Sequence, residues 1–505
     1  MRPFILSFIA GFFLLIQMNA CAQSADTSDR ISQVEGNLVG ATQTEGEVPG
    51  TIKDRMAHYH VNGVSIAVIH NYKIEWAKGY GLADADRKIP VTDQTLFQAA
   101  SISKSLNAVG VLRLAQDKKI DLYADINNYL HSGKEAGATD SYSLIHAGQL
   151  NWKFPYDSLS RNKKISVANL LSHTAGLTVH GFGGYEKGTD IPSIVQVLDG
   201  KQPANSAPVR SMYEPGLKFE YSGGGIVISQ LIITNITHQP YEQYMYDNVL
   251  KPLDMAGSTY SQFPTGNMKL LLATAYDTKA NEIPGKHHIY PEQAAAGLWT
   301  NPTDLSKYII EMQLALQGKS NKVLNQQITK TMLTPYIDKQ AALGVFVENM
   351  DSTKYFGHGG SNEGFRSQYY GSFEGGNGVV VMVNSDNGDI IPEIVNSVAK
   401  VYGFKGLYRT KIVKPVSVTL TENVLQSYTG EYQLAPDFIL AITREGDKLY
   451  GKVPGKSRLT LFPETESKFY INLADIEIEF IKDDKGKVVR AMVYENGPHD
   501  AKKME

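Results

Sequence analysis

The arrangement of apolar residues changes near residue 411, and this change constrains the fold more than any other feature of the sequence. Before it, apolar runs of helical length alternate with β-rich runs. After it, short alternating strands are separated by turns such as Glu-Gly-Asp and Asp-Lys-Gly. A chain of 505 residues is also longer than one ordinary domain. We therefore predict a mixed unit over residues 47–408 and a small all-β, barrel-like unit over residues 409–505.

The start of the chain has the composition of a secretory signal. Arg2 precedes an almost wholly apolar stretch, FILSFIAGFFLLIQM, which is shorter than the roughly 20 residues of a membrane-spanning helix. Two processing outcomes are open: cleavage after a signal of residues 1–22, or attachment of a lipid to Cys21, which would anchor the protein to a membrane. Either outcome places the mature protein outside the cytoplasm, in the periplasm or secreted. Residues 23–46 are polar and predict a flexible tether.

Composition excludes several classes of function. The chain is 42% apolar and 20% charged, with a formal net charge of −3 and no long run of one sign. This predicts a protein with large cores, no nucleic-acid groove and no polybasic membrane patch. Cys21 is the only cysteine, so no disulfide is expected. No metal-ligand spacing and no phosphate-binding glycine loop stands out, so we expect no metal and no cofactor.

The mixed unit begins and ends with β-rich runs. Residues 63–70 and residues 72–81 predict a hairpin, and residues 378–386 predict a buried strand near the other end. Helices are predicted between them over residues 165–177 and 223–237, and residues 294–316 predict a turn, an Asp/Thr-type cap region and then an amphipathic helix. Because strands occur at both ends of the unit, we expect the first and last strands to pair in one sheet covered by helices, which is an α+β fold.

A lysine lies inside the apolar stretch FQAASISKSLNAVGVLRLAQ, three positions after a serine. On a helix, Ser101 and Lys104 share one face. A serine hydroxyl is a poor nucleophile at neutral pH and needs a base within about 3 Å. Burial and the positive end of a helix dipole both favour a neutral amine, which can take that proton. Since S-x-x-K also occurs by chance, the pattern alone leaves a surface lysine open.

The stretch LFQAASISKSLNAVGVLRLAQDKKIDL resembles the active-site helix of the penicillin-recognising serine hydrolases, which include class C β-lactamases, D,D-carboxypeptidases, D-aminopeptidases and related esterases. Five further segments resemble that family in the family's order: LLSHTAGL, EPGLKFEYSGGG, KPLDMAGSTY, AAAGLWTNPTDLSKY and FGHGGSNEGFRSQYYG. The resemblance covers roughly residues 47 to 405. It implies a β-lactamase/transpeptidase-like antiparallel sheet covered by helices, with Ser101 as nucleophile and Lys104 as base. YTGEYQL resembles the lipocalin-like accessory β domain of such hydrolases.

The family's second motif, Tyr-x-Asn, is represented here by Tyr221-Ser222-Gly223. The resemblance implies that the Tyr221 phenol relays the proton between Ser101 and the leaving group. Glycine replaces the asparagine that holds the amide side chain of lactam substrates. This departure disfavours β-lactam turnover and favours peptide or ester substrates.

The third motif, Lys/His-Thr/Ser-Gly, is represented by His358-Gly359-Gly360, followed by Ser361. The resemblance puts His358 at the basic position. A histidine can be neutral or charged near pH 7, which predicts pH-dependent binding of a carboxylate. Gly359 lacks the usual hydroxyl, Gly360 lets the backbone approach the substrate, and the N–H groups of Ser101 and Ser361 would form the oxyanion hole.

Four other residues carry weaker predictions. His173 in LSHTAGL is predicted to be structural and not catalytic. Arg366 could meet a substrate carboxylate or form a surface salt bridge. Tyr185 and Trp299 could be cleft walls or core. Residues 132–150 form an extra segment that could cover a cleft or be a neutral insertion.

Together these features predict an extracytoplasmic serine hydrolase that forms an acyl-enzyme on amide or ester bonds. The expected partner is a small-molecule or peptide substrate, and the sequence leaves the oligomeric state open. A non-catalytic peptidoglycan- or β-lactam-binding protein that uses the same cleft is the alternative. An apolar-ligand barrel in the last ninety residues is a third hypothesis.

Overall fold

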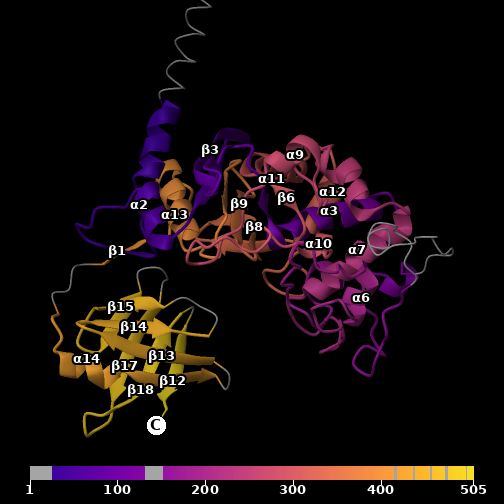
Figure 1. Cartoon of the computed structure of the whole chain (residues 1–505). Helices are drawn as coiled ribbons and strands as arrows, with labels where there is room; N and C mark the ends of the chain where they lie inside the picture. The colour runs from indigo at the N-terminus through magenta and orange to yellow at the C-terminus, as the bar shows by residue number, and fades with distance from the viewer. Residues whose placement is uncertain are drawn as a thin grey trace, which may run out of the picture. The chain divides into compact units, whose positions relative to one another are not determined.

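A computed structural model describes residues 26–130, 152–413, 418–435, 438–454, 458–471, 476–495 and 497–504. The predicted signal, Cys21 and the 132–150 segment lie outside these ranges. The chain divides into two compact units (Figure 1): one contains residues 56–391 and 404–406, and the other contains residues 28–55, 392–403 and 407–505. Within the described ranges, no helix is both long enough and apolar enough to cross a membrane.

A seven-stranded antiparallel sheet forms the centre of the larger unit, in the order β4-β3-β2-β10-β9-β8-β7. Its strands are β2 (Gly63–His70), β3 (Lys73–Asp84), β4 (Ile89–Pro90), β7 (Phe346–Met350), β8 (Thr353–Asn362), β9 (Phe365–Ser372) and β10 (Gly378–Val383). β10 pairs with β2, with Val380 opposite Ala67. The prediction that the first and last strands of the unit pair is therefore confirmed.

Helices pack around this sheet, and α11 lies against its strands β2, β9 and β10. The helical elements of the larger unit are η1 (Ala100–Ile102), α3 (Ser103–Gln116), η2 (Ile126–Asn128), α5 (Val167–Leu171), α6 (Ile194–Asp199), α7 (Gly223–Thr237), α8 (Tyr241–Met245), η3 (Tyr246–Leu250), α9 (Gly266–Leu270), α10 (Gln293–Ala296), α11 (Pro302–Leu316) and α12 (Gln326–Met332). A separate pair of short strands, β5 (Phe97–Gln98) and β6 (Trp299–Thr300), holds the chain that leads into η1. Two more helices, α2 (Ile52–Tyr59) and α13 (Ile390–Tyr402), contribute residues to both units.

Local sequence explains where these helices begin and end. The predicted helix 223–237 is α7, and the Ser222 side chain caps it by accepting a hydrogen bond from Gly225 N. The helix predicted over residues 165–177 is shorter: α5 ends at Leu171. Its early end follows from His173, which has a φ of 58°, a left-handed conformation that no α-helix accommodates.

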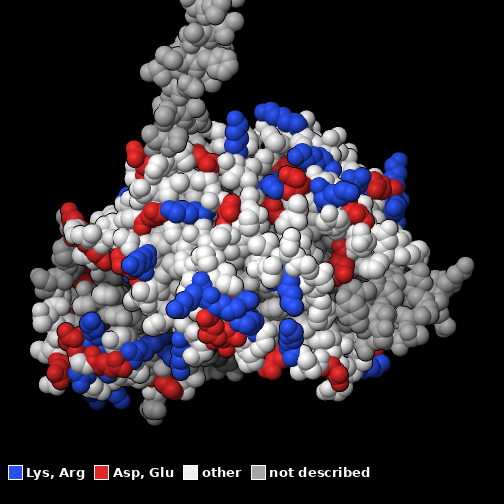
Figure 2. Space-filling model, turned by 45° about the horizontal axis from the view of Figure 1, so that its top comes forward, with Lys and Arg blue, Asp and Glu red and all other residues white. Residues whose placement is uncertain are grey.

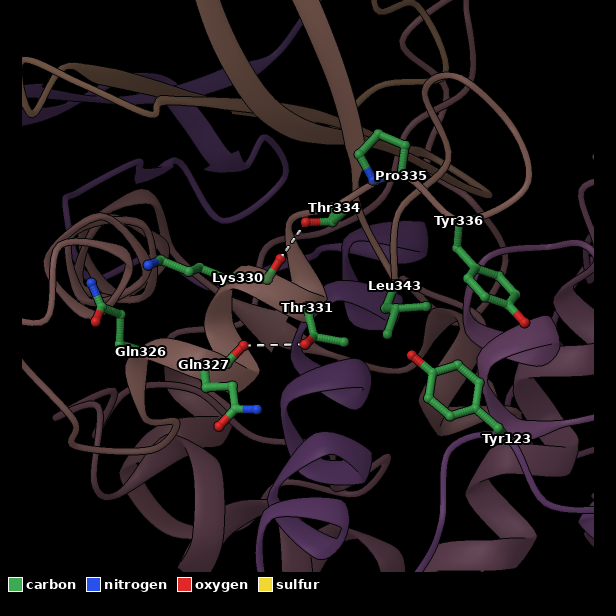
Figure 3. A pocket seen from close by; sticks show the side chains of 9 residues that line it. All are labelled: Tyr123, Gln326, Gln327, Lys330, Thr331, Thr334, Pro335, Tyr336 and Leu343. Atoms are coloured by element: carbon green, nitrogen blue, oxygen red, sulfur yellow. Dashed lines mark hydrogen bonds between the residues drawn. The ribbon is translucent and has the colours of Figure 1, made fainter.

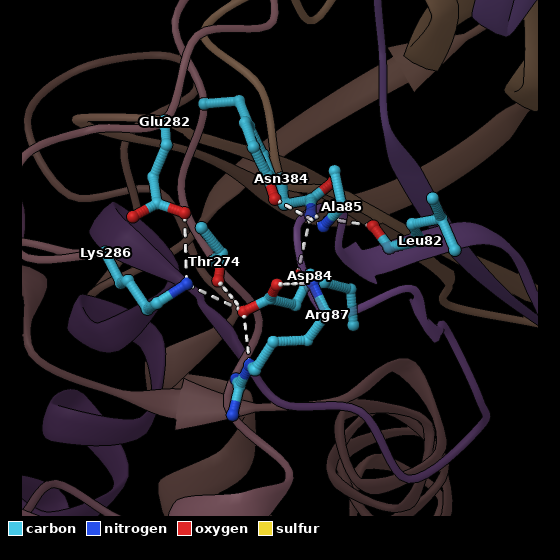
Figure 4. Close-up of polar contacts among 10 residues, drawn as sticks. Leu82, Asp84, Ala85, Arg87, Thr274, Glu282, Lys286 and Asn384 are labelled. Atoms are coloured by element: carbon cyan, nitrogen blue, oxygen red, sulfur yellow. Dashed lines mark hydrogen bonds and ion pairs between the residues drawn. The ribbon is translucent and has the colours of Figure 1, made fainter.

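An ion cluster around the buried carboxylate of Asp84 ties β3 to a distant loop (Figure 4). The Asp84 carboxylate receives hydrogen bonds from Lys286, Arg87 and Thr274, each 2.8 to 2.9 Å long. Burial works against the charged form, but these hydrogen bonds outweigh it and hold the pKa of Asp84 well below its ordinary value. The cluster is therefore a structural clamp on the end of β3.

The second unit contains a closed eight-stranded antiparallel barrel. Its strands are β12 (Gly430–Ala435), β13 (Phe438–Glu445), β14 (Lys448–Lys452), β15 (Leu459–Pro463), β16 (Lys468–Ile471), β17 (Ile476–Lys482), β18 (Val488–Tyr494) and β19 (Pro498–Lys503), preceded by α14 (Glu422–Tyr428). Buried side chains fill the interior in its described part: the rings of Tyr428 and Phe480 stack 4.4 Å apart, and Tyr432 and Phe469 pack around them. The open apolar interior that an apolar-ligand barrel needs is not seen there.

The segment predicted as a flexible tether contains ordered structure. Residues 26–35 are helical, and β1 (Thr42–Thr44) pairs in parallel with β11 (Lys411–Val413). Val34, Leu38 and Val39 are buried, and within the same unit Thr42 Oγ1 donates to Ile471 O. These few apolar residues are scattered in polar sequence, and the strand that pairs with β1 lies more than 360 residues away. Composition alone therefore did not reveal this structure.

Candidate active site

Ser101 and Lys104 are in direct contact where η1 leads into α3. Lys104 Nζ lies 2.8 Å from Ser101 Oγ and donates a second hydrogen bond to Ala295 O at 2.7 Å. Lys104 is only 2% exposed, and none of the ion pairs in the described part of the chain involves it. The two atoms are therefore placed as a proton transfer between a serine nucleophile and its base requires.

The turn that carries Ser101 is held in an unusual backbone conformation. Ala100 has a φ of 50°, which is uncommon for a residue with a Cβ. The residue before it is held on both sides: Ala99 N donates to Leu298 O, and Ala99 O accepts from Ser367 Oγ. Such locally strained backbone persists where surrounding contacts over-determine it, as at functional sites.

Tyr221 lies beside this pair, immediately before α7. Lys104 Nζ is 5.1 Å from the centre of the Tyr221 ring. The ring stacks on Phe346 with centroids 6.4 Å apart. Among the described residues no hydrogen bond joins the Tyr221 hydroxyl to Ser101, so Tyr221 joins the site through ring contacts.

His173, predicted to be structural, holds the segment that carries Tyr221. Its ring lies 4.3 Å from the Tyr221 ring, its Nδ1 accepts a hydrogen bond from Ser222 N, and its carbonyl accepts one from Glu220 N. Burial, followed by the charge of Lys104, lowers the pKa of His173 well below its ordinary value, so the ring is neutral. A histidine inside the apolar LSHTAGL segment was the available signal.

His358 is neutral as well, which corrects one expectation. Burial first, and the nearby Lys104 charge second, lower its pKa to about 3. Its Nδ1 is 2.6 Å from the carbonyl oxygen of Gly359, so Nδ1 carries the proton and Nε2 is an acceptor with no partner in the described structure. The predicted pH-dependent capture of a carboxylate by a charged His358 near pH 7 is therefore wrong, because charging the ring would require an ion in a buried position.

β8 packs directly on the turn that carries Ser101. A Cβ on Gly360 would lie 2.2 Å from Ala99 O, so only glycine permits this approach. A Cβ on Gly359 would lie 2.8 Å from Oε1 at the end of the Gln368 side chain and would have no other close contact. Ser361 follows on the same strand and is exposed. The oxyanion hole from the N–H groups of Ser101 and Ser361 remains a prediction.

The comparison with known families agrees with this geometry. Residues 48–392, more than half of the chain, match the family described as Beta-lactamase. The chain belongs to the Beta-lactamase family. Members of this family are usually serine hydrolases. Residues 414–504 match a domain of unknown function, DUF3471.

Individual proteins also resemble the chain over most of its length. Protein flp of Staphylococcus aureus (strain MRSA252) is 24% identical over 444 residues, which cover 83% of this chain and 78% of that protein. The octameric penicillin-binding protein homologue from Pyrococcus abyssi has a TM-score of 0.57 at 21% identity, covering 89% of this chain and 98% of that one. The D-amino acid amidase from Ochrobactrum anthropi SV3 has a TM-score of 0.54 at 20% identity, and the match covers 74% of this chain and 99% of the amidase. These structures show the fold.

The position of the missing Beta-lactamase family asparagine is closed by packing. A Cβ on Gly223 would lie 3.0 Å from both His180 O and the Phe182 ring. Phe182 also lines a cavity of about 340 Å³ together with Val179, Asn205 and Ala207. This cavity, with its mixed apolar and amide lining, lies beside Phe182, whose ring borders the position of Gly223.

Ion pairing and burial decide between the alternatives left open for Arg366, Trp299 and Tyr185. Arg366 forms an ion pair with Asp386 at 2.9 Å and donates to Asn362 O, so its guanidinium is used structurally. Trp299 is buried and packs edge-on against Phe365, and Tyr185 is also buried; both belong to the core.

A group that sequence reasoning missed is Glu292, which precedes α10. It is fully buried, and neither carboxyl oxygen has a hydrogen-bond partner in the described structure. Burial raises the pKa of Glu292 to about 8, so the group is mostly protonated at pH 7. Since α10 supplies the Ala295 carbonyl that accepts a hydrogen bond from Lys104, Glu292 directly precedes the helix that supports the base.

Proposed function

We propose that this protein is an extracytoplasmic serine hydrolase that cleaves amide or ester bonds through an acyl-enzyme. The observation that carries the proposal is the 2.8 Å contact between Lys104 Nζ and Ser101 Oγ in a buried position. Membership of the Beta-lactamase family supports it. The extracytoplasmic location rests on the apolar start of the sequence.

In the proposed reaction, Ser101 Oγ attacks the substrate carbonyl while Lys104, with Tyr221, takes its proton. The backbone N–H groups of Ser101 and Ser361 stabilise the oxyanion. Tyr221, with the neutral His358 nearby, then delivers the proton to the leaving group. Water attacks the acyl-enzyme and regenerates Ser101.

We propose a D-amino peptide or a small ester as substrate, in preference to a β-lactam. Two features support this choice: Gly223 cannot supply the amide of Tyr-x-Asn, and the buried, neutral His358 does not present a cation to the carboxylate of a lactam. The D-amino acid amidase structure, which shares the fold, is described as complexed with L-phenylalanine amide.

The test is the intact mass of the mature protein during incubation with a penicillin and, separately, with an active-site-directed phosphonate. Ser101→Ala serves as the control. We expect a phosphonate adduct on the parent and none on Ser101→Ala, with little or no turnover of penicillin.

Three other outcomes decide between the hypotheses. A lasting penicillin adduct on the parent alone would identify a penicillin-binding peptidase. A brief adduct with accumulating product would identify a β-lactamase and overturn the argument from Gly223. No adduct with either reagent would favour the non-catalytic binding protein.

A further inference from the structure

A second cavity of the larger unit lies outside the candidate active site. Its volume is about 460 Å³, within the range of small-molecule sites. Figure 3 shows the rings of Tyr123 and Tyr336 along one side and the polar side chains of α12 along the other, with Leu343 between them. The α12 side carries Gln327, Lys330 and Thr331. Two walls of different chemistry therefore face one cavity.

The aromatic wall is exposed and held in place. Tyr123 is 61% exposed, and its ring centre lies 6.1 Å from that of Tyr336 with the planes tilted by 39°. Hydrogen bonds hold the backbone of both residues: Tyr123 N donates to Asp121 Oδ1, and Tyr336 N donates to Ala341 O, each at 2.9 Å. Exposed rings at fixed positions offer a flat apolar surface at a low entropic cost of binding.

The opposite wall offers uncommitted polar groups. The Thr331 hydroxyl donates to Gln327 O and keeps its acceptor lone pairs for a ligand. Within the described residues, the Gln327 amide and the Lys330 ammonium make no hydrogen bond or ion pair with protein side chains. This wall can therefore donate to and accept from a ligand that carries several hydroxyl or amide groups.

These features select a class of ligand. Lys330 is the one charged residue in the lining, so the cavity lacks the clustered cations that phosphate or polycarboxylate ligands require. The aliphatic lining is limited to Leu343 and Pro335, which is too little for an acyl chain. On the face of the molecule shown in Figure 2, basic and acidic side chains are interspersed, so this face has no large patch of one charge. A pyranose combines a C–H face, which packs on aromatic rings, with a rim of hydroxyl groups.

We propose that this cavity is a saccharide-binding site for one or two pyranose units of a glycan chain. Tyr123 and Tyr336 pack against the sugar faces, and Gln327, Lys330 and Thr331 hydrogen-bond the hydroxyl or acetamido groups. The chain from Tyr336 continues to Phe346, whose ring contacts Tyr221 and His358. One segment thus lines both the cavity and the candidate active site. The binding itself does not depend on the proposed hydrolase activity.

The test is calorimetric titration of the full-length mature protein with chitotetraose and with cellotetraose, which differs by hydroxyl groups in place of acetamido groups. We expect at least one tetrasaccharide to bind, and Tyr123→Ala to weaken binding by about tenfold or more. Tyr246→Ala, at an exposed tyrosine on η3, is the matched control and should bind as the parent does. Lys330→Ala tests the other wall.

The outcomes separate this proposal from the proposed function. Hydrolysis of a small ester should be unchanged in Tyr123→Ala, because this exposed side chain is outside the catalytic contacts. Selective binding of chitotetraose would assign recognition to the acetamido group, and equal binding of both sugars would assign it to the pyranose ring. No binding of either sugar at millimolar concentration, or undiminished binding by Tyr123→Ala and Lys330→Ala, would overturn the proposal.

Discussion

His173 shows how one residue that touches no reacting atom can position one that does. It contacts the Tyr221 ring, accepts from Ser222 N and, through its carbonyl, accepts from Glu220 N. The residues directly before and after Tyr221, Glu220 and Ser222, are thereby both hydrogen-bonded to His173. The orientation of the candidate proton relay then depends on His173, which is a positioning residue.

Replacing His173 with Asn keeps a residue that tolerates a positive φ and removes the ring beneath Tyr221. We expect kcat to fall about 10- to 100-fold with little change in KM, because the ring orients the proton relay and does not bind substrate. The matched control is His238→Asn, at an exposed histidine with a φ of 55° at the end of α7. Steady-state kinetics on the best ester substrate provide the measurement. Equal losses in both variants would contradict the role of His173.

Buried titratable groups make the stability of the protein depend on pH. The folded-state pKa of Glu292 is raised to about 8, so between its ordinary value and pH 8 the folded state binds more protons than the unfolded state. Stability must then fall as pH rises through this window. The lowered pKa values of His173 and His358 act oppositely: their contribution is present above pH 6.5 and is lost as pH falls below it.

Above about pH 7.5 both histidines are neutral in the folded and the unfolded states, so between about pH 7.5 and 9 only the Glu292 contribution changes among these three groups. We expect the free energy of unfolding to decrease over this range by up to about 1 kcal/mol per pH unit. Glu292→Gln, which cannot ionise, should flatten the decrease. Urea unfolding at half-unit pH steps measures it, and a decrease that persists in Glu292→Gln would assign it to other groups.

At the scale of secondary-structure elements, the site depends on how closely β8 approaches η1. Hydrogen bonds from Ser367 Oγ and to Leu298 O hold Ala99 in place, and Gly360 lies against the Ala99 carbonyl. The β8–β9 pairing sets this position, because Gly360 lies opposite Ser367. The register of two strands therefore determines the position of the nucleophile.

Gly360→Ala should displace β8 from the Ser101 turn, because its Cβ would lie 2.2 Å from the backbone oxygen of Ala99. We expect hydrolysis to fall at least about 100-fold and the free energy of unfolding to fall by about 1–3 kcal/mol. Gly359→Ala is the matched variant, since its Cβ meets only the movable end of Gln368. It should retain the stability of the parent. Thermal unfolding and ester hydrolysis compare the two, and an unaffected Gly360→Ala would refute the packing argument.

At the scale of the whole molecule, the smaller unit includes more than the barrel: residues 28–55 and 392–403 belong to it. Within this unit the Arg55 guanidinium forms a two-point ion pair with the fully buried carboxylate of Glu393. This pair joins two segments that are 338 residues apart in the sequence. A buried charge of this kind is strongly destabilising when its partner is removed.

We expect Arg55→Met to lower the stability of the smaller unit by about 3 kcal/mol, because it removes the cation that makes a two-point ion pair with the buried Glu393 carboxylate. Differential scanning calorimetry should show one transition shifted downward. The control is Arg458→Met at the exposed Arg458–Glu445 pair, whose loss should leave the transition nearly unchanged. Equal shifts in the two variants would contradict the assignment.

Much of the architecture could be predicted from the sequence because it depends on local patterns. Residues 63–70 and 223–237 have the periodicities of the strand and helix that they form, and the alternating strands after residue 411 close into a barrel. The spacing of Ser101 and Lys104 is likewise local, since side chains three residues apart in a helical turn share a face.

Only the tertiary structure decided the contacts that depend on packing between distant segments. The ring of His173 against Tyr221, the neutral states of His358 and Glu292, and the ordered β1 strand all result from burial by residues far away in the sequence. Helical periodicity follows from backbone geometry, which each residue carries with it. Burial and electrostatic environment follow from which remote segments meet, and no local pattern contains that information.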